Sequence, residues 1–403
     1  MNDMTTEKQN KRPNVPPLRF PEFNDEWQHV KLGSLAIKVG SGSTPRGGNS
    51  VYTKAGHCFV RSQNVGMGIL FLNDIVYIDE RTHQKQKSTE IKENDVLLNI
   101  TGASIGRTAI ATKEIDGGNV NQHVCIIRVR ESVVPNFICY YIQLPKTQKY
   151  IQSLQTGGSR EGLNFDQVRS FPISLPVGIE QSKIVQFLGL LDRRISVQNK
   201  IIEDLRQLKS ALVERLYGQH NPNYRIGDLV VQVSERNRSD NNYSVLSVNN
   251  RLGFIEQSEQ FEDRSVASDD TSNYKVVSRN DFAYNPARIN VGSIARLTSY
   301  ENGIVSPMYI CFHTKKHILP QYLEHFFNTC YFQNEMQKRL EGSVRLCLSW
   351  EGLCNIPIAM PPIEQQEKVG KRISLLADKI ELEVSHLNLL NTQKQYLLQA
   401  MFI

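Results

Sequence analysis

Apolar residues recur at alternating steps of four and three along two long stretches of the chain, which is the heptad pattern of a coiled coil. The first set of positions is Ile184, Leu188, Leu191, Ile195, Gln198, Ile202, Leu205, Lys209, Leu212 and Leu216, and the second is Val369, Ile373, Leu376, Ile380, Glu383, Leu387, Leu390, Lys394, Leu397 and Met401. Each position of the second set lies 185 residues after its counterpart. A helix over residues 180–217 would be roughly 57 Å long, so the pattern predicts paired rods rather than helix faces packed on their own domains.

The segments before these two helices repeat as well. The helix starts read "LPVGIEQSKI" from Leu175 and "MPPIEQQEKV" from Met360, while "IKENDVLLN" from Ile91 matches "VSRNDFAYN" from Val277. Runs such as "HVCIIRVR" and "MYICFHTK" predict strands, and prolines begin predicted helices near Pro135–Leu154 and Pro320–Leu340. We therefore predict an α/β (α+β) fold with two tandem units separated by a long antiparallel two-helix coiled coil. The predicted bounds are 1–25 for an extended N-terminal segment, 26–178 for the first unit, 179–218 for the central helix, 219–362 for the second unit and 363–403 for the C-terminal helix.

Connectivity predicts the direction of the second helix. Only "GQHNPN" separates the end of the first helix from the second unit, and six residues span at most about 20 Å. The second helix must then run back along the first, which gives a pseudo-twofold arrangement. For the register we expect Lys209 to face Glu383, and Gln198 to face Lys394, because a charge opposite leucine would be unpaired. The first two apolar positions of each helix are then free to pack on the units.

Composition narrows the class of protein. The chain has 403 residues, 40% of them hydrophobic, and no apolar run near the roughly 20 residues of a membrane span. The polar N-terminus argues against a secretory signal, and seven cysteines without a Cys-x-x-Cys argue against a disulfide framework or a zinc site. None of the nine histidines has metal-site spacing. We expect a cytoplasmic protein whose net charge of +6 is compatible with nucleic acid.

Two similar units held apart by a rod suit duplex DNA, where major-groove faces recur about every 34 Å. The target would be two unlike short sequences around a gap of unread base pairs. The paired Pro-led helix starts with a Glu-Gln pair, the tandem units and "GSGSTP" at Gly40–Pro45 together resemble the specificity subunits of type I restriction–modification systems. The Pro-rich opening "RPNVPPLRFPEF" is similar to family members too.

That resemblance implies two target-recognition domains, each reading half of a bipartite DNA site. It also implies helices that scaffold two DNA-methyltransferase subunits and, in the full complex, restriction and translocation subunits. S-adenosylmethionine, ATP and Mg²⁺ are then expected on those partners, with no cofactor in this chain. The second unit shows "VSERNRSD" where the first has the "GSTP" loop.

Candidate DNA contacts are the Arg, Asn, Gln, Ser and Thr side chains of Gly-rich loops, since these residue types read base edges or bind phosphates. For the first unit they are Ser43, Thr44, Arg46, Arg61, Gln63, Asn64, Thr101, Ser104, Arg107, Ser159 and Arg160. For the second they are Arg236, Asn237, Arg238, Arg288, Asn290, Ser293 and Arg345. Arg160 and Arg345 coincide at the repeat offset, which favours a shared phosphate contact. The alternative for any one of them is an ordinary solvated loop side chain.

Two alternatives to a non-catalytic DNA reader remain open. "YNPAR" at Tyr284–Arg288 resembles the Asn-Pro-Pro-aromatic motif of adenine methyltransferases, but Ala287 and Arg288 replace its second proline and its aromatic residue. The "GSGSTPRGG" loop lacks the Gly-Lys-Ser/Thr end of a phosphate loop. A self-contained DNA-modifying enzyme, a methyltransferase or nuclease, is therefore the second hypothesis, and a coiled-coil scaffold without DNA affinity is the third.

Overall fold

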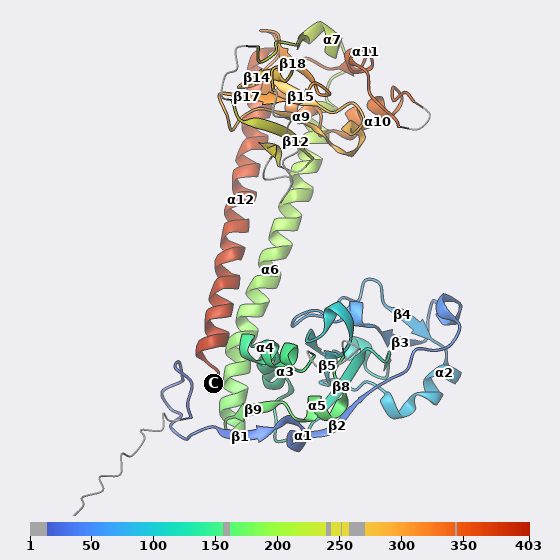
Figure 1. Ribbon diagram of the computed structural model, residues 1–403, viewed down its shortest axis with the longest axis vertical. Coiled ribbons are helices and arrows are strands. Elements are labelled where there is room, and N and C mark those ends of the chain that lie inside the picture. The colour runs from blue at the N-terminus through green and yellow to red at the C-terminus, as the bar shows by residue number, and fades with distance from the viewer. Residues whose placement is uncertain (1–13, 156–161, 239–242, 251, 258–270, 343–344) are drawn as a thin grey trace, which may run out of the picture. The chain divides into compact units, whose positions relative to one another are not determined.

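The computed structural model describes residues 14–155, 162–238, 243–250, 252–257, 271–342 and 345–403 (Figure 1). It divides into two compact units, one formed by Met1–Val197 with Leu387–Ile403 and the other by Gln198–His386. Each unit therefore contains a globular part and one end of each long helix. None of the helices in the described ranges is both long enough and apolar enough to cross a membrane.

The first unit is built on an antiparallel four-stranded sheet in the order β2-β8-β5-β6. A second sheet, β4-β3-β7, pairs β3 with β7 in parallel, and β1 pairs with β9. The strands are β1 (Gln28–Lys31), β2 (Ala36–Ser41), β3 (His57–Val60), β4 (Val76–Ile78), β5 (Val96–Asn99), β6 (Thr108–Ile110), β7 (Asn119–Val120), β8 (Val124–Val129) and β9 (Pro172–Leu175). The helices around them are α1 (Leu32–Leu35), α2 (Glu80–Lys85), α3 (Pro135–Gln143), α4 (Pro145–Ser153) and α5 (Phe165–Arg169).

The second unit repeats this topology. Its four-stranded sheet has the order β11-β18-β15-β16, its other sheet β13-β12-β17-β14 again contains one parallel pair, and β10 pairs with β19. The strands are β10 (Tyr224–Arg225), β11 (Val230–Val233), β12 (Val245–Asn249), β13 (Gly253–Glu256), β14 (Lys275–Ser278), β15 (Phe282–Tyr284), β16 (Ile294–Arg296), β17 (Asn302–Val305), β18 (Ile310–Thr314) and β19 (Pro357–Ile358). The helices are α7 (Ile226–Leu229), α9 (Pro320–Phe326), α10 (Cys330–Gln337) and α11 (Trp350–Cys354). The repeat predicted from the sequence is thus a repeat of topology.

Strand alternation sends successive side chains of each central sheet into two different cores. In β5, Val96 and Leu98 point into the core shared with α3 and the long helices, while Leu97 points into the core between the two sheets. In β15, Phe282 and Tyr284 occupy the helix-side core and Ala283 the core between the sheets. Both faces of each central strand are therefore buried.

The Pro-initiated helices differ from the prediction, because each is two helices rather than one. In the first unit the break falls at Leu144, whose extended backbone (φ −60°, ψ 138°) is the conformation that a following proline favours. In the second unit the break falls at Thr329, whose hydroxyl accepts from the amide of Phe332 and begins a new helix.

The predicted coiled coil is confirmed by two continuous helices that pack side by side, α6 (Gly178–Tyr217) and α12 (Ile363–Ala400) (Figure 1). All twenty predicted seam positions are buried or half-buried. In the second unit Gln198 contacts Glu383, while Val213 and Leu216 share a core with Ile373. Residue numbers thus rise on one helix as they fall on the other, so the helices are antiparallel.

The predicted register is wrong. The Gln198 amide donates to the main-chain and side-chain oxygens of Glu383 at 3.0 and 2.5 Å, so the residue opposite Glu383 lies eleven positions before Lys209. Lys394 instead pairs with Asp192 at 2.6 Å, and Asp192 also accepts from the hydroxyl of Tyr140. The prediction failed because it sought a partner for Lys394 among the seam positions. Its partner is Asp192, which lies next to the seam residue Leu191.

The duplicated Glu-Gln start holds each long helix to its own unit through main-chain contacts. Gln181 and Gln366 are almost fully buried. The Gln181 carbonyl accepts from the amide of Val134, just before α3, and its amide donates to Pro176 O. Gln366 makes the same two bonds 185 residues later, to Leu319 N before α9 and to Pro361 O. The repeated glutamine is therefore a clamp between the long helix, the preceding proline segment and the first helix of the unit.

Candidate nucleic-acid interface

In the first unit, two groups of polar residues lie at the carboxyl ends of parallel strands. Val60 of β3 pairs with Val120 of β7, so the residues that follow these strands emerge at the same edge of the sheet. Arg61–Asn64 follow β3, and 121–123, with the sequence Asn-Gln-His, follow β7. The carboxyl edge of this parallel pair is thus the place where the candidate residues converge.

The Gly-rich loop after β2 is joined to this edge by a chain of hydrogen bonds. The Gln122 carbonyl accepts from the amide of Thr44 at 2.9 Å and from the Thr44 hydroxyl. Its amide nitrogen therefore faces His123 Nε2, at 3.0 Å, and His123 Nδ1 donates to the hydroxyl of Thr101. The structure thus brings the predicted Thr44 and Thr101 together through Gln122 and His123.

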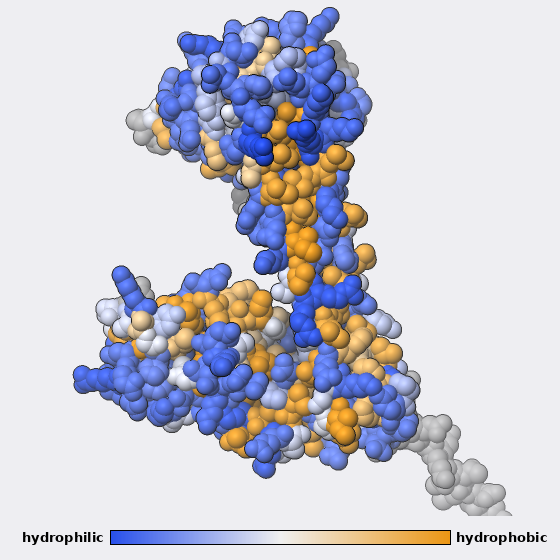
Figure 2. All heavy atoms as spheres, turned by 180° about the vertical axis from the view of Figure 1, so that it is seen from behind, coloured by the Kyte–Doolittle hydropathy of each residue, from blue (hydrophilic) through white to orange (hydrophobic). Residues whose placement is uncertain are grey.

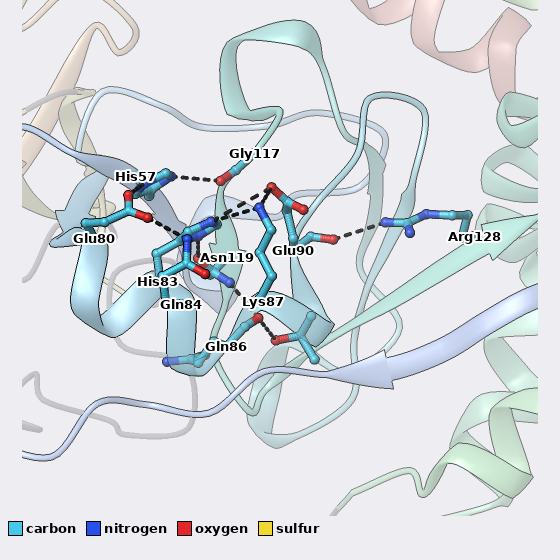
Figure 3. Close-up of polar contacts among 11 residues, drawn as sticks. His57, Glu80, His83, Gln84, Gln86, Lys87, Glu90, Gly117, Asn119 and Arg128 are labelled. Carbon is cyan, nitrogen blue, oxygen red and sulfur yellow. Dashed lines mark hydrogen bonds and ion pairs between the residues drawn. The ribbon is translucent and has the colours of Figure 1, made fainter.

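A second chain of contacts leads from α2 to the same loop, and Figure 3 shows the part of it that runs through His83, Asn119 and Gln86. The Ser43 amide donates to Gln86 Oε1 at 3.1 Å, and the Gln86 main-chain oxygen accepts from Asn119 Nδ2 at 3.1 Å. Asn119 Oδ1 in turn accepts from His83 Nδ1 at 2.7 Å. The His83 ring stacks on His57 at 3.7 Å between centroids. This cluster anchors the loop to β7 and α2.

The His57 side of this cluster lies between two acceptors. His57 Nδ1 is 3.1 Å from Gly117 O and Nε2 is 2.6 Å from Glu80 Oε2, so each ring nitrogen faces an oxygen. Hydrogen bonds from Gln84 and His57 lower the pKa of Glu80. On the other ring, Lys87 donates to His83 Nε2 at 3.3 Å and to Glu90 at 2.8 Å, and that bond lowers the pKa of Glu90.

Three predicted residues after β3 donate hydrogen bonds to Asp74. Asn64 is fully buried, accepts from the amide of Arg61 and donates to Asp74 Oδ1 at 2.8 Å. Gln63 also donates to the Asp74 side chain. The Arg61 guanidinium donates to the main-chain oxygen of Asp74 at 2.8 Å and lies over the ring of Tyr52. Asn64 therefore supports the loop from within, while Gln63 is exposed beside it.

In the second unit, the corresponding edge borders a hollow of about 830 Å³. Three predicted residues line it: Arg288, Ser293 and Arg345. Ser293 is buried and its hydroxyl donates to Val248 O at 3.2 Å, so its role is to shape the wall. Arg288 and Arg345 are exposed, and the amide side chains of Asn249, Asn250, Gln257 and Asn285 complete a lining rich in hydrogen-bonding groups.

The other predicted residues of the second unit are more dispersed. Arg236 donates to the main-chain and side-chain oxygens of Asn273 at 3.1 and 3.2 Å, and Asn237 is buried with its amide bonded to Tyr274 O. Because Tyr274 itself lines the hollow, this pair borders it. Arg238 and Asn290 are exposed and lie outside the lining.

Five predicted arginines share one property. They are exposed, and none makes an ion pair or a side-chain hydrogen bond with another residue in the described parts of the chain: Arg46, Arg107, Arg238, Arg288 and Arg345. Ser43 and Thr44 are also exposed, and Ser104 is half-buried in the loop before β6. Ser159 and Arg160 lie outside the described residues. The free guanidinium groups are available to an anionic partner.

Nothing in the described ranges groups three or more His, Cys, Asp or Glu side chains in a way that could hold a metal ion. The most buried thiols have raised pKa values, because burial disfavours the thiolate: about 12 for Cys125, about 11 for Cys139 and about 12 for Cys311. Cys347 and Cys354 are half-buried free thiols. These cysteines are packing residues rather than nucleophiles.

Sequence reasoning missed Gln122 and His123 in the first unit, and Asn249, Asn250 and Gln257 in the second. A signal for two of them was present in the repeat. The β3 segment "VRSQN" and the β12 segment "LSVNN" occupy equal places beside their parallel partners, since Val60 pairs with Val120 and Leu246 with Val305. Aligning them would have carried the prediction for Gln63 and Asn64 over to Asn249 and Asn250.

Comparisons with known proteins agree with this architecture. A family model described as the type I restriction modification DNA specificity domain matches residues 24–207. The chain is 27% identical to the EcoBI specificity subunit of Escherichia coli over 136 residues. This matched stretch covers 33% of this chain and 28% of that protein. It is 24% identical over 200 residues to the HindI specificity subunit of Haemophilus influenzae, covering 49% and 42%. The matches thus span less than half the length of these two relatives.

Fold similarity extends over almost all of the chain. The crystal structure of a type I restriction–modification S subunit from M. genitalium aligns with a TM-score of 0.57 at 15% identity, covering 96% of this chain and 99% of that one. Residues 24–207 therefore resemble a type I restriction modification DNA specificity domain, and the fold of nearly the whole chain resembles that of a type I restriction–modification S subunit.

Proposed function

We propose that this chain is the non-catalytic DNA-specificity subunit of a type I restriction–modification complex. Each unit would read one half of a bipartite, gapped DNA sequence. The observation that carries the proposal is the set of five exposed arginines on both units that have no ion-pair or side-chain hydrogen-bond partner among the described residues. Two of them, Arg288 and Arg345, line one hollow together with asparagine and glutamine side chains. Arginine pairs with guanine, asparagine and glutamine pair with adenine, and all of them also bind phosphates.

The two units would read different halves because their reading edges differ. The first presents Thr44, Gln122 and Thr101 on a hydrogen-bonded chain, whereas the second presents a hollow between Arg288 and Arg345. A site built from unlike halves follows from two copies of one topology with unlike loops.

The paired helices would set the gap and carry the partner subunits. Along α12, an exposed apolar side chain recurs every seven residues. These side chains are each 60% or more exposed: Leu375, Leu382, Leu389 and Tyr396. Leu190 and Val197 of α6 lie 185 residues before the first two and are exposed as well, and Figure 2 shows apolar side chains along the helix pair. A heptad-spaced apolar face on the outside of a coiled coil suits further helices, here those of two methyltransferase subunits. S-adenosylmethionine, ATP and Mg²⁺ would be bound by those subunits and by the restriction subunits.

The direct test is binding of the purified chain to a pool of randomised duplexes, followed by sequencing of the bound fraction. We expect a motif with two short halves around a fixed gap, and binding at least about tenfold weaker when the salt is raised, because phosphate contacts release counterions. A chain that shifts no duplex at low salt would instead be a scaffold.

A methyl-transfer assay separates the specificity subunit from a self-contained enzyme. The chain alone should transfer no methyl groups, and adding the methyltransferase subunit should give transfer at the enriched motif. Transfer by the chain alone would favour the enzyme hypothesis. Inserting one matched heptad in α6 and in α12 tests the role of the helices: the gap should lengthen while both halves persist.

A further inference from the structure

The Gly-rich loop of the first unit is held by two glutamines that face successive backbone amides. The Ser43 amide donates to Gln86 Oε1 at 3.1 Å, and the Thr44 amide donates to Gln122 Oε1 at 2.9 Å. The side chains of Ser43 and Thr44 are themselves exposed. The two carbonyls therefore fix the backbone at neighbouring points and so set where both hydroxyls are presented.

Each glutamine makes a further hydrogen bond through a group other than the carbonyl that faces the loop. Gln86 is 7% exposed, and its main-chain oxygen accepts from Asn119, which His83 orients (Figure 3). Gln122 donates to His123 Nε2, which is fixed by Thr101. Gln86 is therefore fixed at a buried position, whereas the exposed side chain of Gln122 is held by hydrogen bonds at both ends of its amide, to Thr44 and to the half-buried His123.

The same loop also rests directly on β7. A Cβ added to Gly42 would lie 1.8 Å from the main-chain oxygen of Val120, so only glycine allows this approach. The residue before Ser43 is thus pressed against the strand that leads to Gln122. Three consecutive residues, 42 to 44, are positioned by contacts that involve none of their own side chains except the Thr44 hydroxyl.

We propose that Gln86 and Gln122 are positioning residues for DNA reading by the first unit, holding the loop at Ser43 and Thr44 in the conformation that meets the target. This inference rests on the proposed function. Discrimination between bases requires side chains placed to within about half an ångström, and a loop anchored at one end only would not keep that geometry. The second unit has Ser-Pro-Met-Tyr at 306–309 where the first has Asn-Gln-His, so the effect belongs to one half of the site.

The test compares Gln86→Met and Gln122→Met, which keep the side-chain length but remove the carbonyl. Gln84→Met is the matched control, since Gln84 lies in α2 two residues before Gln86, is exposed and bonds Glu80 instead of the loop. Amide hydrogen exchange at Ser43 and Thr44 is measured first. Exchange should rise about fivefold at Ser43 in Q86M and at Thr44 in Q122M, the change expected for one lost hydrogen bond, and stay unchanged in Q84M.

Each variant is then incubated with the randomised duplex pool. In Q86M and Q122M one half of the enriched motif should lose sequence preference, with about tenfold weaker binding to the parent motif, while the other half and the gap stay the same. Q86E keeps an acceptor for the Ser43 amide and should restore the half-site, which a merely structural role would not require. Unchanged Trp27 fluorescence confirms that the first unit is folded.

Faster exchange with an unchanged motif would overturn the proposal, and so would unchanged exchange in both variants. Loss of both halves would show that the glutamines act on folding rather than on reading. A parent chain that enriches no motif contradicts the proposed function itself, and with it this role for the glutamines, even where exchange responds.

Discussion

The two units share a hydrogen-bonded frame but differ in how they treat buried charge. In the first unit Asp95 is buried and accepts from Arg128 through two bonds of 2.7 Å. In the second, Asp281 stands at the position of Asp95 in the matching strand, and His313 stands at the position of Arg128. Asp281 accepts from the amide of Ser278, and burial raises the pKa of its carboxyl. Both carboxylates accept from a main-chain amide, of Lys92 and of Ser278, and Asp95 alone has a guanidinium as a further partner among the described residues.

The contacts with the long helices differ in the same way. In the first unit Tyr140 donates to Asp192 at 2.6 Å, and Asp192 pairs with Lys394. At the offset of 185 the second unit has His325, Ala377 and Lys209, so the acid is missing. His325 Nε2 is buried without a partner among the described residues, and burial, Lys209 and Arg296 lower its pKa to about 4.

The difference teaches which contacts survive duplication. Gln181 and Gln366 make the same bonds in both units because their partners are main-chain groups, which are present whatever the sequence. Bonds between two side chains, such as Arg128 with Asp95, are lost when either residue changes. The same argument applies to the candidate reading loops. Their exposed side chains can differ between the units while the main-chain contacts that support them stay the same.

The largest expected effect comes from breaking the buried ion pair of the first unit. Arg128→Met leaves the Asp95 carboxylate buried without a cation and should reduce the free energy of unfolding of this unit by about 3 kcal/mol. His313→Met, at the corresponding place in the second unit, should change stability by less than about 1 kcal/mol, because His313 is exposed. The two tryptophans separate the units: urea unfolding is followed by Trp27 in a W350F background and by Trp350 in a W27F background. Equal losses in both units would contradict the comparison.

The duplicated clamp should give effects of equal size. Gln181→Leu and Gln366→Leu each leave a buried main-chain amide and carbonyl without a partner, which should cost about 2 kcal/mol in the unit concerned. Exposed glutamines of the same helices, Gln186 and Gln365, provide the controls, and their leucine variants should be nearly neutral. The same fluorescence measurement applies. A large loss in one unit only would show that the clamp is not shared.

The smallest effect is a pH dependence confined to the second unit. As pH falls through the ordinary histidine pKa of about 6.5, the unfolded chain binds a proton that folded His325 does not bind until about pH 4. Stability of the second unit should therefore decrease across this window, by about 1–2 kcal/mol at pH 5. His325→Tyr, which places the first unit's residue there, should flatten the profile. The same slope in parent and variant would exclude His325 as the cause.

Much of the architecture could be predicted from the sequence because repetition and heptad spacing are properties of residue order. The twenty seam positions and the antiparallel direction follow from periodicity and from the short link at 218–223. Asn94 and Asn280 stand at the same place in the repeated segments that begin at Ile91 and Val277, and both have a positive φ, of 71° and 74°. The register could not be predicted, because it depends on Asp192, a residue outside the seam.

The candidate site could be predicted only in part. Residue type selected Thr44, Arg288 and Arg345, which are exposed, but it also selected Asn64, Asn237 and Ser293, which the fold buries. Burial of a loop side chain depends on tertiary contacts such as that of Asn64 with Asp74, which lies ten residues further along the chain. Gln122 and His123 were missed for the converse reason, since their importance comes from the loop that folds back onto them.

The most direct test of the account is the motif enriched from randomised duplexes by paired arginine variants of each unit. Arg46→Ala with Arg107→Ala should blur one half of the motif, and Arg288→Ala with Arg345→Ala should blur the other, with the gap unchanged in both. Either pair blurring both halves, or altering the gap, would show that the units do not read DNA independently.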